Sequence, residues 1–102
     1  SPGMPNVASI VQDARVKIDQ ARTRARSRLE NAVSDAERQT IRRDEINEAR
    51  AALSTAANEI RKAILLVRAD DPELATVQRA TVIAVANAID SVGIKLSRAV
   101  DL

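Results

Sequence analysis

The sequence predicts an all-α protein, folded as a small antiparallel three-helix bundle or as a long helical hairpin. Hydrophobic residues recur at steps of three and four along most of the chain, whereas a strand would alternate with period two. Between Pro5 and Pro72 there is neither a glycine nor a proline, so the elements must be long. A chain of 102 residues, 45 % hydrophobic and 29 % charged, has the size and composition of one globular domain.

The first residues are expected to lie outside the fold. Ser1-Pro2-Gly3 ahead of Met4 is typical of a cloning remnant, and we expect residues 1–6 to be disordered and residues 7–102 to form a single helical domain. No secretory leader follows Met4, and no uncharged run approaches the roughly 20 residues that a membrane span needs. We therefore expect a cytoplasmic protein without a membrane span, and export without a leader stays open. We predict helices at about 7–37, 41–69 and 73–100.

The helix predicted at 7–37 carries a hydrophobic seam, a line of residues that share one face of the helix. Its end is ambiguous, because no glycine closes it. Ser34-Asp35-Ala36-Glu37 matches a capping box, Thr40 offers a later helix start, and one unbroken helix over 7–69 is an alternative. We place the turn at 37–41 because this gives three helices of about 29 residues each. The seam consists of Val7, Val11, Ala14, Ile18, Ala21 and Ala25.

The helix predicted at 41–69 has the most regular seam, in which large and small residues alternate. An alanine at every other position lets a neighbouring helix approach closely, so we expect a partner helix along most of its length. The seam consists of Ile46, Ala49, Leu53, Ala56, Ile60, Ala63 and Val67.

The helix predicted at 73–100 has the clearest start. Asp70-Asp71-Pro72-Glu73 supplies an N-cap, a proline at the first helical position and an acid in the first turn. This helix is hydrophobic on most sides and is therefore expected to be buried on most sides, either in a homo-oligomer or against another helical protein. Gly93 inside it marks a close helix crossing or a weak last turn, at a cost of about 1 kcal/mol relative to alanine. The predicted interface consists of Val82, Ile83, Val85, Ala86, Ile89 and Val92.

Charge is distributed unevenly along the first half of the chain. Residues 1–29 carry six cations and two anions, whereas residues 30–60 carry four cations and seven anions. One hypothesis is that the basic run binds the phosphates of nucleic acid or another polyanion. The other, which we favour, is that it pairs with the acidic segment, because its two stripes lie on nearly opposite sides of a helix and no aromatic residue is present to stack on bases. The stripes are Arg15, Arg22 and Arg26, and Lys17, Arg24 and Arg28.

The missing residue types exclude several kinds of chemistry. Without His or Cys the chain has no imidazole base, thiol nucleophile, disulfide or zinc finger. Asp44, Glu45 and Glu48 form the one acidic group that could hold a metal ion, and we interpret it as surface charge because Arg42 and Arg43 adjoin it. We predict no enzymatic activity, cofactor, metal or small-molecule substrate. The predicted function is a structural or protein-interaction module with coiled-coil-like helices, and nucleic-acid binding is the alternative.

Overall fold

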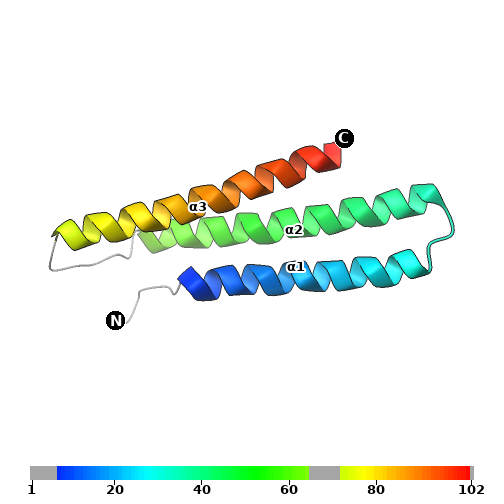
Figure 1. The fold of residues 1–102 in the computed structure, drawn as a ribbon, viewed down its shortest axis with the longest axis horizontal. Helices are drawn as coiled ribbons and strands as arrows, with labels where there is room; N and C mark the ends of the chain where they lie inside the picture. The colour runs from blue at the N-terminus through cyan, green and yellow to red at the C-terminus, as the bar shows by residue number, and fades with distance from the viewer. Residues whose placement is uncertain (1–6, 65–71, 102) are drawn as a thin grey trace.

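A computed structural model describes residues 7–64 and 72–101 of the chain, which form three α-helices (Figure 1). Helix α1 spans Val7–Glu30, α2 spans Asp35–Ile64 and α3 spans Pro72–Asp101. Neighbouring helices are antiparallel, and α2 lies between the other two (Figure 1). The prediction of an all-α three-helix fold is thereby confirmed. The expectations for residues 1–6, for the end of the second helix at 69 and for the cap at 70–71 fall outside the described residues.

The turn between α1 and α2 lies at residues 31–34 and not at the predicted 37–41. A variant of the capping box forms here: Glu37 N donates to Ser34 Oγ at 3.1 Å, and Glu37 Oε2 accepts at 3.0 Å from the amide of Val33, one residue before the N-cap. At the end of α1, the side-chain amide of Asn31 donates to the carbonyl of Ser27 at 3.2 Å. These local bonds outweigh the argument from equal helix lengths, and α1 has 24 residues where α2 and α3 have 30.

The core lies where the start of α1, the end of α2 and the start of α3 come together. Of the thirteen buried hydrophobic residues among those described, nine are alanines, and the largest fully buried side chains are Ile41 and Ile60. The alternating seam predicted on α2 is buried at Ala56, Ile60 and Ala63, but its large residues Ile46 and Leu53 are only half-buried, so the expected partner helix does not cover most of its length. The central cluster consists of Ile10, Ala14, Ala56, Ile60, Ala63, Val82 and Ala86.

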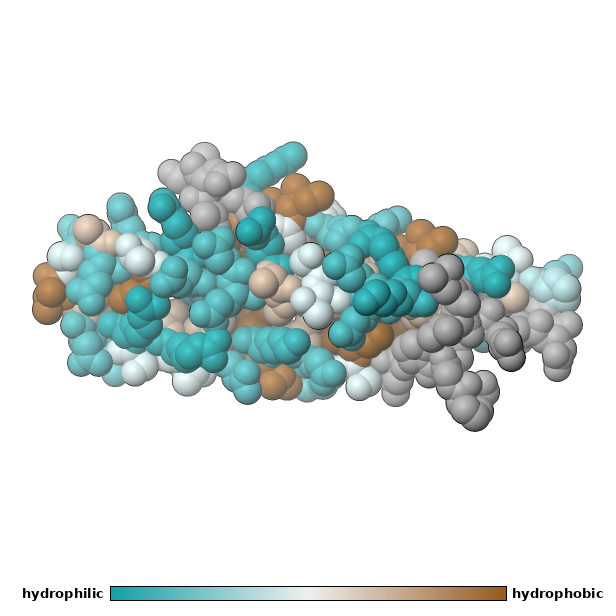
Figure 2. Space-filling view, turned by 180° about the vertical axis from the view of Figure 1, so that it is seen from behind, coloured by the Kyte–Doolittle hydropathy of each residue, from teal (hydrophilic) through white to brown (hydrophobic). Residues whose placement is uncertain are grey.

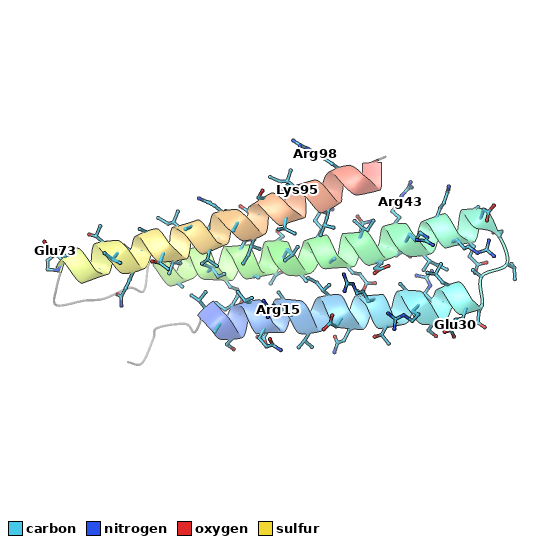
Figure 3. All side chains as sticks on the ribbon, in the orientation of Figure 1. Arg15, Glu30, Arg43, Glu73, Lys95 and Arg98 are labelled. Carbon is cyan, nitrogen blue, oxygen red and sulfur yellow. The ribbon has the colours of Figure 1, made fainter. Side chains whose placement is uncertain are left out.

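The three helices form a flat layer of 61 × 25 × 13 Å. Both α1 and α3 pack against α2, and α3 diverges from α2 toward its own C-terminal end (Figure 1). The edge of α2 that faces α3 changes in character along its length. It carries Ala57, which is buried, and Arg61, which pairs with Asp90, and one and two heptads before Ala57 it carries the exposed Arg50 and Arg43. Arg43 projects from α2 toward the side on which α3 leaves (Figure 3).

Candidate interaction surfaces

The six residues predicted to form an interface on α3 lie in three different environments. Val82 and Ala86 are buried in the central cluster, and Val85 and Ile89 are half-buried against it. Ile83 and Val92 are exposed, at 44 % and 48 % of their surface. A helix that packs against only one neighbour buries one stripe, so the seam of α3 serves the core and its other sides stay open.

Exposed large hydrophobic side chains are concentrated on α3. It carries four of the six among the described residues, and α1 carries one, Val16. Two of the four, Val77 and Ile94, are not among the residues predicted from the sequence, although Ile94 follows Ile83 by eleven residues, a spacing that puts both on one side of a helix. Val92 follows Ile83 by nine residues, which places it on the opposite side. The four residues on α3 are Val77, Ile83, Val92 and Ile94.

A groove lies on one face of the layer where α3 diverges. Its volume is about 500 Å³, and all three helices contribute to it. Most of its lining is hydrophobic, and Leu53 and Ile46 on the central helix are only half-buried because α1 and α3 do not close over them. The lining residues are Ile18, Arg22, Arg42, Glu45, Ile46, Ala49, Leu53, Val92 and Leu96.

A second hollow, of about 370 Å³, lies between α2 and α3 and is lined by Arg50, Asp90, Gly93 and Ile94 among others. Because Ile94 and Val92 lie on opposite sides of α3, this hollow and the groove open on opposite faces of the layer. Figure 2 shows a face on which hydrophilic side chains predominate and hydrophobic ones stand singly, several of them toward the edge formed by α3. The exposed hydrophobic surface of α3 is therefore spread over more than one side.

The basic run of α1 divides into the two stripes that the spacing predicts. Arg24 forms an ion pair with Glu48, and Arg28 forms one with Asp44 at 2.9 Å. All four side chains are about half exposed, so each pair contributes only about 0.2–1 kcal/mol. For Arg24 and Arg28, pairing with the acidic segment is thus the arrangement that the fold adopts.

In the described part of the chain, the stripe of Arg15, Arg22 and Arg26 does not pair with the acidic segment. Arg15, Arg22 and Arg26 are exposed and form no ion pair with another described residue, and Arg22 lines the groove. Lys17, which shares its stripe with Arg24 and Arg28, lies beside Gln20 and Glu48 in a shallow hollow between α1 and α2.

The acidic group of α2 serves as a partner for arginines. Asp44 and Glu48 accept hydrogen bonds from α1, and Glu45 is a half-buried part of the groove lining. Across residues 7–64 and 72–101, no three acidic, histidine or cysteine side chains lie close enough together to hold a metal ion.

Within the same two ranges, no helix combines the length and the hydropathy that a bilayer-spanning segment needs. The sequence matches no family model, and comparisons with curated proteins and with solved structures find no match. The surfaces of α3 and the groove are therefore interpreted from their own residues.

Proposed function

We propose that this protein is a non-enzymatic helical interaction module that self-associates through the exposed hydrophobic surface of α3. The observation that carries the proposal is that this one helix holds four of the six large hydrophobic residues found exposed in the described part of the chain. Single exposed hydrophobic side chains are normal on a protein surface, whereas neighbouring ones favour an interface. On α3, Ile83 and Ile94 share one side of the helix and supply such a pair. Self-association would remove this surface from water at about 25 cal/mol per Å².

The composition of the core supports the same proposal. A chain of this size buries a smaller fraction of its surface than larger domains do. Here the core is also poor in large side chains, because nine of its thirteen described hydrophobic residues are alanines and the sequence has no aromatic residue. Burial within one chain therefore yields limited stability, and contact between chains would add to it.

The structure indicates which substitution tests the proposal. Ala86→Asp is unsuitable because Ala86 is fully buried, so a charge there would disrupt the core. Ile83→Asp is suitable, since Ile83 is 44 % exposed and outside the central cluster. The matched control is Val16→Asp, because Val16 is 43 % exposed but lies on α1.

We expect Ile83→Asp to weaken self-association by at least about tenfold, which corresponds to 1.4 kcal/mol, because a carboxylate loses hydration in a hydrophobic interface. Val16→Asp is expected to leave the dissociation constant unchanged. Analytical ultracentrifugation of the three proteins measures this constant, and circular dichroism verifies that the helices persist. Equal dissociation constants for all three would place the interface elsewhere than on α3.

A second candidate function is the binding of nucleic acid or another polyanion by α1. It is favoured by Arg15, Arg22 and Arg26, which are exposed and have no ion pair among the described residues. Three phosphate contacts predict a slope of about −3 for log K against log salt on duplex DNA. Replacing all three by Gln should abolish this slope, and failure to bind DNA at about 50 mM salt would exclude this function.

A further inference from the structure

The groove combines a hydrophobic floor with a basic edge. Its floor includes Ile46 and Leu53 of α2, both half-buried in the chain as described. Along its α1 edge, Arg22 lines the groove. Arg15, seven residues earlier, and Arg26, four residues later, lie on the same stripe of α1 as Arg22. These three arginines are the ones that form no ion pair with another described residue, whereas Arg24 and Arg28, on the other stripe, do.

We propose that this groove binds an amphipathic helix of another protein, one whose hydrophobic face is flanked by acidic residues. In helix-in-groove recognition the hydrophobic face supplies most of the affinity. The flanking carboxylates would pair with the guanidinium groups of the α1 edge, which suit carboxylates because they can donate two parallel hydrogen bonds. The proposal goes beyond self-association, since the groove lies on the side of α3 opposite to Ile83 and Ile94.

The dimensions suit a helix of a few turns. Ile46 and Leu53 are seven residues apart, or about 10 Å along α2, and Arg15 and Arg26 are eleven residues apart, or about 16 Å along α1. A docked helix of about three turns would contact the floor and reach all three arginines. The divergence of α3 leaves the face of α2 open, so no helix has to move aside.

A second copy of this chain fits the groove less well, for reasons of charge. In a two-fold dimer stacked groove to groove, α1 faces either α1 or α3 of the other copy. The first arrangement opposes like charges. In the second, the arginines would face Val85, Val92 and Leu96, which carry no charge. In both arrangements the other copy presents the same four arginines, Arg15, Arg22, Arg26 and Arg42, and only two carboxylates, Asp19 on the α1 stripe and Glu45 in the lining. The facing surfaces then carry the same net positive charge, so an acidic partner helix complements the groove better than a second copy does.

The test uses the full chain and three synthetic helical peptides of about 21 residues, a length of about 32 Å. Each peptide has leucine at the two hydrophobic positions of every heptad, and the flanking positions carry glutamate, glutamine or lysine. Fluorescence anisotropy at low salt measures binding. We expect the glutamate peptide to bind about tenfold more tightly than the glutamine peptide, from about three exposed ion pairs, and the lysine peptide to bind most weakly.

Matched variants assign the binding to the groove. Replacing Arg15, Arg22 and Arg26 together by Gln should remove the preference for glutamate, about tenfold in affinity. Replacing Lys17, Arg24 and Arg28 by Gln removes the same charge from the other stripe and should leave the preference intact. Val92→Gln changes the hydrophobic lining without adding a charge and should weaken binding of all three peptides by about tenfold.

Several outcomes would overturn the proposal: equal binding of the three peptides, binding that the first triple substitution does not change, or binding that Val92→Gln does not change. Binding of duplex DNA that depends on Arg15, Arg22 and Arg26 but not on Val92 would assign the edge to a polyanion.

Failure of the peptides to bind, while Ile83→Asp still dissociates the protein, would refute the groove alone. Peptide binding to a protein that stays monomeric would refute self-association alone.

Discussion

At the scale of single residues, the fold is determined by where small side chains lie and where charges find partners. The hydrophobic spacing correctly placed Ala14 and Ala56 in the core, because residues three and four apart share a helix face. It did not place Ile10 and Ile41, which are also buried. Both lie beside a seam, and whether such a residue is covered depends on how wide the contact between two helices is, which the spacing does not specify. The ion pair between Arg28 and Asp44 was one of several pairings that the sequence allowed, and the register of α1 against α2 selects it.

Gly93 leads to a prediction at this scale. A Cβ atom added there would meet nothing within 4 Å, so the glycine serves no close helix crossing. Gly93→Ala should therefore stabilise the protein by about 0.5–1 kcal/mol through helix propensity alone, raising the melting temperature by about 2–8 °C. Thermal denaturation followed by circular dichroism measures the shift.

The control for this change is Ala84→Gly on the exposed side of the same helix, which should lower the melting temperature by a similar amount. A lower melting temperature for Gly93→Ala would show that its side chain meets a neighbour, contrary to the geometry described.

At the scale of helices, the sequence was sufficient for the number, type and direction of the elements but not for the first turn. The argument from equal lengths placed that turn at 37–41, whereas hydrogen bonds place it at 31–34. A signal was available in the sequence: Asn31, a residue favoured where helices end, precedes the capping box that begins at Ser34. The divergence of α3 could not be predicted, because no local pattern in the sequence specifies how far along α2 the contact with α3 extends.

The position of this turn gives the second prediction. Ser34→Ala should destabilise the protein by about 1 kcal/mol, because Glu37 N loses the hydroxyl that accepts its hydrogen bond. Thr40→Ala should be neutral or stabilising, because Thr40 lies in the interior of α2, where alanine is the better helix former. Chemical denaturation of both variants measures the two changes in the free energy of unfolding. The opposite order of effects would place the helix start at Thr40.

At the scale of the whole molecule, the flat arrangement determines which surfaces are available. In a closed bundle each helix would pack fully against two neighbours, but here α1 and α3 flank α2 and pack mainly against it, and they share a core only at one end of the layer (Figure 1). The sequence predicted that α3 has more hydrophobic surface than one chain can cover; of the residues it named, Ile83 and Val92 are exposed, whereas Val82 and Ala86 belong to the core of the chain itself. It did not reveal the groove, because the groove is formed by side chains of three helices whose separation no local pattern encodes.

The central claim is that the chain self-associates, and its mass in solution tests this claim most directly. Light scattering or sedimentation of the unaltered protein should give a mass that rises with concentration, from the 11.0 kDa of one chain toward a multiple of it in the micromolar range. Such a rise would show that copies of the chain associate, and its loss in Ile83→Asp would place the contact on α3. A mass that stays at 11.0 kDa up to high micromolar concentration would contradict the proposed function.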